Sequence, residues 1–278
     1  MRSIFRPIPF ALFLLATAAG GQAGESPPAS GPAVKHLSTL KFLKGTYTSI
    51  FGIVPKRYTV ESVETRESVQ TMRGPDAFAL DLVAANTQRI LSLEGETPTI
   101  ENGTKPLVGN TVLGVRRGDS WEPQIKDVAA PSEAEQKEAR RLVARFQPGG
   151  SPFLSPAWDT NGKAVLELPR VLRFFGYAQA DEIHGSATLQ KPEAEGKGAS
   201  LEMSIQFTSG ENVERITVEL KGAGEVKLHE EEPGYSKVVL QGELTIHGNR
   251  VLEDGRKVPY SLITPYSYET TAETRPAT

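Results

Sequence analysis

The sequence predicts a mostly β fold (α+β), in which long, curved antiparallel meanders carry two short helices in the middle, packed on a sheet face. Three observations predict it. Apolar and polar residues alternate strictly over much of residues 201–247. Turn residues separate β-prone segments in the first half of the chain. Two segments between residues 131 and 176 instead carry apolar residues at helical spacing.

The first 23 residues are typical of a secretory signal peptide. Arg2 and Arg6 give a positive start, and the apolar run 10–19 is too short to span a bilayer as a helix. A small-x-small motif favours cleavage after Ala23. We therefore expect an exported protein, periplasmic or extracellular, whose mature chain is soluble and has no transmembrane segment.

Beyond the leader we expect a single β-rich domain over residues 34–269. Residues 24–33 are rich in Gly, Pro, Ser and Ala and predict a flexible lead into the domain. Residues 270–278 are polar and predict a disordered tail. Strand patterns on both sides of a helical middle favour a duplicated or pseudo-symmetric plan, although no repeat of fixed period is visible.

The domain is expected to have two β halves, at about 34–125 and 180–269, joined by a helical middle at about 131–176. In the first half, β-prone runs bounded by turn residues such as Asn86 predict strands. The predicted strands are Tyr58–Val69, Ala77–Val83, Gln88–Leu93 and Thr111–Arg117.

The helical middle contains two amphipathic segments. Ser132 and Glu135 form a capping box directly after Pro131, and this motif predicts the start of the first helix. Pro169 lies where the first turn of a second, shorter helix is expected. The apolar residues at helical spacing are Ala139, Leu142, Val143 and Phe146 in the first helix, and Leu168, Val171, Leu172 and Phe175 in the second. Each apolar stripe indicates packing on a sheet face.

The C-terminal half shows the clearest strand pattern. Residues 201–208 alternate strictly between apolar and polar side chains, which predicts a half-buried strand. The same parity continues through Gly222 and Gly224, so we predict one long strand at about Val213–His229 that is bent at these glycines. A third strand follows, with one apolar face over 238–246.

Composition and motifs narrow the functional classes. The absence of cysteine excludes disulfides, thiol catalysis and cysteine-bound metals. The formal net charge is −3 and no run of Lys or Arg forms a basic stripe, so we expect neither nucleic acid nor an anionic membrane surface as a partner. No nucleophile elbow, phosphate loop, zinc-protease motif or dinucleotide fingerprint is present, and the four histidines lack metal-ligand spacing. We therefore predict no catalytic, cofactor or metal residues.

The leader, the segment 109–121, the short helix after it and the closing meander together resemble uncharacterised secreted bacterial β-rich proteins classed as a domain of unknown function. More loosely, long curved strands with helices on the concave side are similar to the lipoprotein-localisation-factor fold, a half-open curved sheet that holds acyl chains. The first resemblance implies no catalytic residue. The second implies, by analogy of fold alone, an apolar ligand.

We expect a non-enzymatic envelope protein that binds an apolar ligand or lipid between the curved sheet and the helices. The candidate lining residues are Phe207, Val218, Leu220, Leu240 and Leu244. The same parity is compatible with a filled core, and the sequence leaves both open. A scaffold that binds another envelope protein, and a hydrolase whose site is assembled from distant residues, are the alternative functions. Ligand identity and oligomeric state stay open.

Overall fold

The computed structural model describes residues 33–51, 54–93, 96–177, 179–192, 198–210, 215–229, 234–251 and 255–275. The predicted signal peptide and nearly all of the predicted flexible lead lie outside these residues. Within the described residues the chain forms twelve strands and two short helices, which confirms the mostly β prediction.

The elements follow one another in a simple order. They are β1 (Ala33–Phe51), β2 (Val54–Met72), β3 (Ala77–Leu93), β4 (Thr99–Thr104), β5 (Thr111–Arg117), β6 (Ser120–Ile125), α1 (Glu133–Phe146), β7 (Lys163–Val165), α2 (Leu168–Phe174), β8 (Ala180–Gln190), β9 (Ala199–Ser209), β10 (Ile216–Leu228), β11 (Tyr235–Val251) and β12 (Lys257–Arg275). Six strands precede α1, the short strand β7 lies between the two helices, and five strands follow α2. The helices thus lie in the middle of the chain, as predicted.

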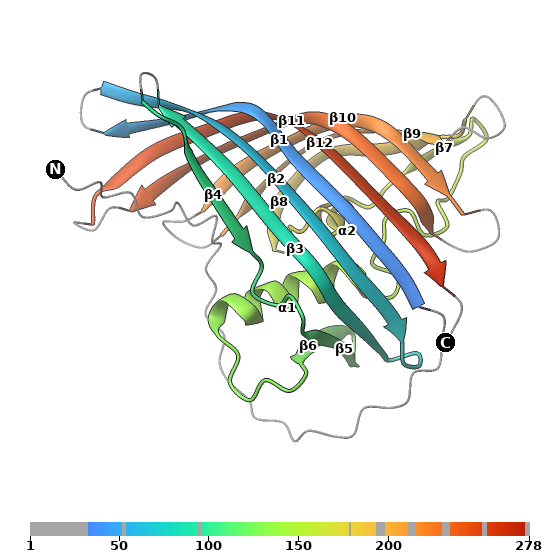
Figure 1. Ribbon diagram of the computed structural model, residues 1–278. Helices are drawn as coiled ribbons and strands as arrows, with labels where there is room; N and C mark the ends of the chain where they lie inside the picture. The colour runs from blue at the N-terminus through green and yellow to red at the C-terminus, as the bar shows by residue number, and fades with distance from the viewer. Residues whose placement is uncertain are drawn as a thin grey trace.

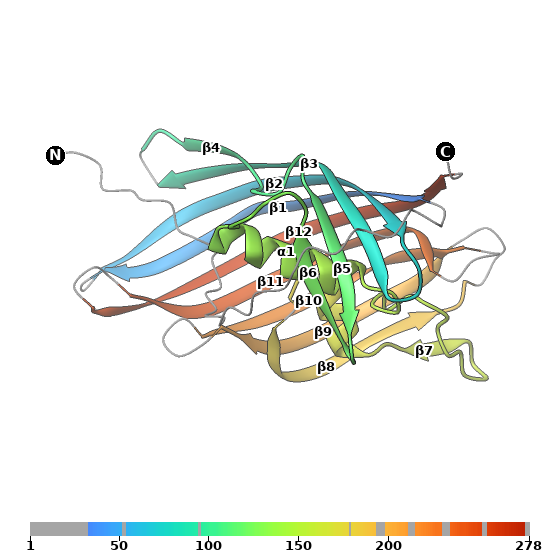
Figure 2. The same cartoon turned by 90° about the horizontal axis from the view of Figure 1, so that it is seen from below.

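All twelve strands belong to one antiparallel sheet with the order β6-β5-β3-β2-β1-β12-β11-β10-β9-β8-β7, and β4 pairs with β3 beside β5. The first and last strands pair in the middle of the sheet, where Ala33 lies opposite Arg275. The two halves of the chain therefore form the two sides of the sheet. The sheet bends into an open arch, and both helices lie beneath it on the concave side (Figures 1 and 2).

Helix α1 begins as the capping box predicts. The Ser132 hydroxyl accepts a hydrogen bond from the Glu135 backbone N–H at 3.3 Å, and the Glu135 carboxylate accepts one from the Ser132 backbone N–H at 2.7 Å. The apolar stripe of α1 packs against β3, β5 and β6 in a small core of its own. The buried stripe consists of Ala139, Leu142, Val143 and Phe146.

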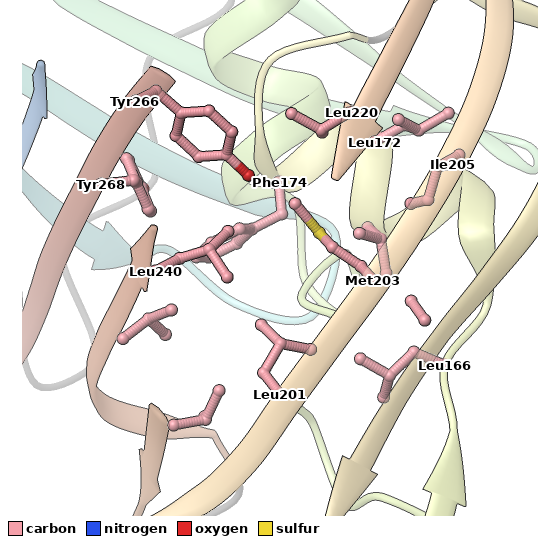
Figure 3. Close-up of a cluster of buried hydrophobic side chains, with 14 of the residues drawn as sticks. Leu166, Leu172, Phe174, Leu201, Met203, Ile205, Leu220, Leu240, Tyr266 and Tyr268 are labelled. Atoms are coloured by element: carbon pink, nitrogen blue, oxygen red, sulfur yellow. The ribbon is translucent and has the colours of Figure 1, made fainter. Parts of the chain in front are cut away.

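A second and larger core lies under the other side of the arch, between β8–β12 and α2 (Figure 3). Phe174 of α2 occupies its centre, with edge-on ring contacts to Phe153, Tyr235 and Tyr268 at centroid distances of 5.1, 5.4 and 6.0 Å. Such edge-to-face packing is a favourable arrangement for buried aromatic rings. This part of the concave face is therefore a filled core.

Strand β10 continues without a break through its glycines, as the parity predicts. Gly222 lies opposite Gly242 of β11, and the Tyr266 hydroxyl donates to the Lys221 carbonyl at 3.1 Å across this gap. A Cβ atom on Gly222 would lie 2.5 Å from the Tyr266 hydroxyl. The Tyr266 side chain thus covers the place where two neighbouring strands lack side chains.

Two boundary predictions are wrong. The segments predicted as Ala77–Val83 and Gln88–Leu93 form the single strand β3, in which Asn86 pairs regularly with Thr65 of β2. The register shifts instead at Val83, between Leu82 and Ala84, so a bulge rather than a turn interrupts the regular pairing. The tail predicted from residue 270 instead continues β12 to Arg275, because β1 pairs with it throughout. Residues 276–278 lie outside the described residues.

Candidate ligand cleft

A cleft of about 510 Å³ lies on the concave side of the sheet, between the strands and α1. Its apolar wall comes from four adjacent strands, β2, β1, β12 and β11. The side chains of this wall include Leu40, Phe42, Val60, Leu244, Ile246 and Leu262. Leu40, Phe42 and Val60 pack at the border of the larger core but are only half-buried, so part of their apolar surface faces the open space of the cleft.

A bulge in β1 allows these strands to present one apolar wall. The pairing of β1 with β2 shifts between Phe42 and Gly45, so that even-numbered residues face inward before the bulge and Tyr47 faces inward after it. Gly45 is needed at this point, because a Cβ atom there would lie 2.6 Å from the Thr264 hydroxyl. That hydroxyl instead donates to the Leu43 carbonyl at 2.9 Å.

The opposite wall of the cleft is cationic. Lys137, Arg140 and Arg141 line it from α1, where spacings of three and four residues place side chains on one face of a helix. Lys105, directly after β4, and Arg89 of β3 complete this wall. We call these five residues the cationic wall.

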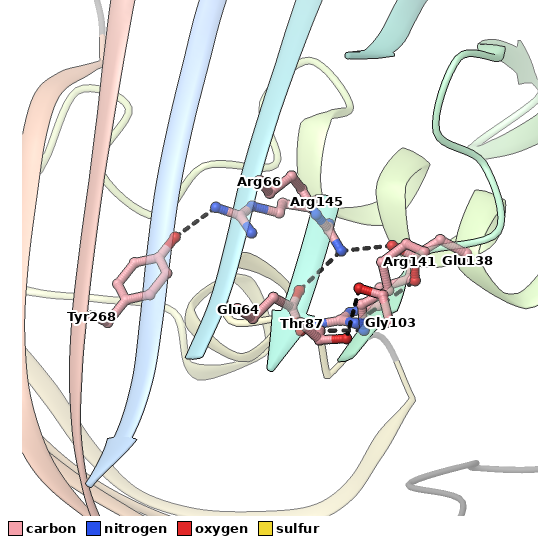
Figure 4. Close-up of polar contacts among 9 residues, drawn as sticks. Glu64, Arg66, Thr87, Gly103, Glu138, Arg141, Arg145 and Tyr268 are labelled. Carbon is pink, nitrogen blue, oxygen red and sulfur yellow. Dashed lines mark hydrogen bonds and ion pairs between the residues drawn. The ribbon is translucent and has the colours of Figure 1, made fainter. Parts of the chain in front are cut away.

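Two carboxylates neighbour the cationic wall. Glu64 lies 3.1 Å from Lys105 and 3.3 Å from Arg66, whereas Glu101 lies 3.7 Å from Arg89 (Figure 4 shows Glu64 and Arg66). Burial alone would raise the pKa of the Glu64 carboxyl, but the charges of Lys105, Arg66 and Arg141 lower it below its usual value. Glu64 is therefore ionised.

Arg141 occupies a defined position between the two helices. Its guanidinium lies 3.7 Å from the Glu138 carboxylate and packs over Gly176, which directly follows α2. Gly176 has a φ of +91°, and a Cβ atom there would lie 2.5 Å from Nε of Arg141. The glycine thus both permits the turn and leaves room for the guanidinium.

A small cavity of about 50 Å³ adjoins the cleft and shares lining residues with it, including Phe42 and Arg141. Arg145 reaches this cavity and donates to the Tyr268 hydroxyl at 2.5 Å (Figure 4). Its guanidinium also lies over the Phe174 ring, 5.4 Å from the centroid. Burial alone would lower the pKa of Arg145, but the neighbouring Tyr268, Tyr235 and Glu64 raise it overall.

The five residues predicted to line a ligand site are all buried in the larger core. Phe207, Val218 and Leu240 are fully enclosed, and the Phe207 ring contacts that of Tyr177 at 4.8 Å. Leu244 lines the cleft and, with Leu220, the small cavity. A filled core and an open cleft therefore both occur, side by side on one face. As ligand contacts, the five residues stay a prediction.

The cationic wall was missed at the level of sequence. A signal existed for its helical part, since Lys137, Arg140 and Arg141 recur at helical spacing opposite the apolar stripe of α1. Lys105 and Arg89 carried no such signal, because the pairing of β4 with β3 places them.

Two further properties bear on function. Among the described residues, no three His, Asp or Glu side chains are grouped so that they could hold a metal ion. Neither of the two described helices is long and apolar enough to cross a membrane.

No family model matches this chain, and no curated protein matches it. A solved structure of lipovitellin, described by its lipid–protein interactions, aligns with 90% of this chain at 10% sequence identity and a TM-score of 0.43. The aligned part is 26% of that chain, so this chain spans about a quarter of its length. At this TM-score the likeness carries no argument about function.

Proposed function

We propose that this chain is an exported, non-enzymatic protein that binds an apolar small molecule or lipid in the cleft beneath the arch. The observation that carries the proposal is the row of half-buried apolar side chains, Leu40, Phe42 and Val60, facing open space in a cleft of about 510 Å³. This volume falls within the range of about 300–1,000 Å³ that is typical of small-molecule sites.

The surrounding structure supports a preformed site. The neighbouring part of the concave face is filled by Phe174 and its partners, so the arch has an internal support that does not depend on a ligand. Buried hydrogen bonds and ion pairs also hold α1 against β2, including the contact between Arg66 and Glu138 at 2.6 Å. A ligand would thus enter an existing space rather than create one.

The first test is native purification followed by solvent extraction and mass spectrometry. A stoichiometric apolar molecule is the expected result. A ligand-free protein that also fails to bind N-phenylnaphthylamine, a neutral apolar fluorescent probe, would overturn the proposal and favour a protein partner.

Site-directed variants test whether the ligand binds in the cleft. Phe42→Ala should weaken binding of N-phenylnaphthylamine about tenfold, because it removes apolar surface from the cleft wall. Ile263→Ala is the matched control, since Ile263 is exposed beside Leu262 but does not line the cleft. Equal effects of the two substitutions would place the probe elsewhere.

Export is the second part of the proposal and is supported by the leader alone. Expression of the full chain in a bacterium should yield a mature protein that begins at Gly24. N-terminal sequencing of the periplasmic fraction and the medium tests this. An uncleaved cytoplasmic protein would contradict export and leave ligand binding to be judged separately.

A further inference from the structure

We infer that the ligand of the cleft is an anionic amphiphile, whose carboxylate or phosphate headgroup is bound by Arg140 and Arg141 while its apolar tail lies along the strands. The inference rests on the proposed function and adds the chemistry of the ligand.

The charge of the cleft is opposite in sign to that of the protein. Five basic and two acidic side chains line it, an excess of three positive charges, whereas the whole chain has a formal net charge of −3. A concave site with walls of low dielectric strengthens the field of such a group of charges. A negatively charged ligand is therefore favoured over a neutral or positively charged one.

The carboxylates of the cleft are already paired with other cations. Glu64 is shared between Lys105 and Arg66, and Glu101 lies beside Arg89. Within the described part of the chain, Arg140 has neither an ion pair nor a hydrogen bond. Its guanidinium charge is thus not offset by any of these acids.

Arg141 has donor capacity to spare as well. Its contact with one oxygen of Glu138 is long, 3.7 Å, and the other oxygen of that carboxylate is bound by Arg66 at 2.6 Å. Gly176 leaves the space in which the guanidinium lies, and the contact with Glu138 positions it beside the cleft. A planar guanidinium in a fixed position suits recognition of a carboxylate or phosphate by paired hydrogen bonds.

The two walls define an orientation. A headgroup at α1 faces the strands that carry Phe42, Leu244 and Leu262, so a tail attached to it meets apolar side chains. A free inorganic anion would leave this apolar wall in contact with water. The arrangement therefore fits a molecule with both a charged and an apolar part.

The test compares ligands that share a tail and differ in charge. Laurate, monododecyl phosphate, dodecanol and inorganic phosphate are each titrated against the full mature protein loaded with N-phenylnaphthylamine, and release of the probe is measured. We expect laurate and monododecyl phosphate to bind at least about tenfold more tightly than dodecanol, and inorganic phosphate alone not to release the probe. The preference should fall as salt concentration rises.

Variants assign the preference to the two arginines. Arg140→Gln and Arg141→Gln should each weaken laurate binding about tenfold and leave dodecanol binding unchanged. Arg170→Gln is the matched control, since Arg170 lies on α2, pairs with Glu167 and does not line the cleft. Arg141→Lys keeps the positive charge and should retain most of the preference for laurate over dodecanol. It therefore separates loss of the charge from a disturbed contact with Glu138.

The outcomes separate the two proposals. Equal affinity for laurate and dodecanol, or an equal effect of Arg140→Gln and Arg170→Gln, would overturn the headgroup assignment and leave apolar binding intact. Failure of all the dodecyl compounds to bind would overturn the proposed function itself. Probe release by inorganic phosphate alone would show a site for free anions and would also overturn the inference.

Discussion

The guanidinium of Arg66 lies 2.6 Å from the carboxylate of Glu138, and this pair connects β2 to α1 inside the arch. Both side chains are nearly excluded from solvent, at 3% and 8% exposed. Such a pair need not add much net stability, but loss of one partner leaves the other charge buried without compensation. The position of α1, and with it the three helical residues of the cationic wall, therefore depends on both residues.

Glu138→Gln should lower the free energy of unfolding by about 3 kcal/mol. The amide has nearly the same shape but leaves the buried charge of Arg66 with Glu64 as its remaining acidic partner, at 3.3 Å. Urea unfolding gives the value. Glu122→Gln, which breaks an exposed pair with Arg117, is the control and should cost less than about 0.5 kcal/mol. Similar losses in both variants would contradict the role given to the buried pair.

Stability should decrease in acid because of His36. Its ring packs on Phe146 at 4.8 Å and bonds Gln70 at 3.2 Å, and burial, aided by the charge of Arg145, lowers its pKa from 6.5 to about 4. Between these pH values the unfolded chain binds a proton that the folded protein does not. The free energy of unfolding should therefore fall by about 3 kcal/mol as the pH drops from 6.5 to 4.

The measurement is urea unfolding at several pH values for the unchanged protein and for His36→Gln. The variant should lack this part of the acid sensitivity, so the two stability curves converge toward pH 4. His247→Gln, at an exposed position of β11, controls for the loss of a histidine as such. Parallel curves for the unchanged protein and His36→Gln would assign the acid sensitivity to other groups.

The glycines of β10 and β11 should differ in their tolerance of substitution. A Cβ atom on Gly242 would collide with the backbone carbonyl of Lys221, whereas one on Gly222 would first meet the movable hydroxyl end of Tyr266. Gly242→Ala should therefore destabilise the protein by about 2 kcal/mol more than Gly222→Ala, because backbone must move. Thermal or urea unfolding of both variants checks the order, and the reverse order would contradict the account of this bend.

Two phenylalanines distinguish the filled core from the cleft wall. Phe207 is fully buried, so Phe207→Ala should cost about 3–5 kcal/mol of unfolding free energy. Phe42 is half-buried beside open space, and Phe42→Ala should cost only about 1 kcal/mol while weakening ligand binding. Urea unfolding and probe titration are measured on the same samples. Equal losses of stability would indicate that Phe42 belongs to a closed core.

Strands β9, β10 and β11 could be predicted from sequence because their residues alternate between the core and the solvent. Leu201, Met203, Ile205 and Phe207 are all buried, and the residues between them are exposed or nearly so. Hydrophobic alternation then reports the pairing directly. Helix α1 was equally accessible, because its start depends on a local motif, the Ser132–Glu135 capping box.

Strands β1 and β2 gave weaker signals for a physical reason. The inward face of β2 carries polar residues, namely Ser62, Glu64, Arg66 and Ser68. These side chains face polar groups of α1, such as the Glu138 carboxylate that binds Arg66. A strand that packs on polar partners loses the alternation on which prediction depends. The bulge near Gly45 then changes the parity within β1. The cleft arises where these two irregular strands meet the regular ones, so its position was beyond the sequence pattern.

The pairing of Ala33 with Arg275 gives the sheet a seam at its centre, because β1 and β12 come from opposite ends of the described chain. Until β12 has been made and released, β1 presents a long unpaired edge on the first meander. Exposed edges of this length recruit other strands, and contacts so distant in sequence form slowly. A partly synthesised chain would therefore be at its most vulnerable to aggregation immediately before its last strand is available, and a holding chaperone would matter most at that moment.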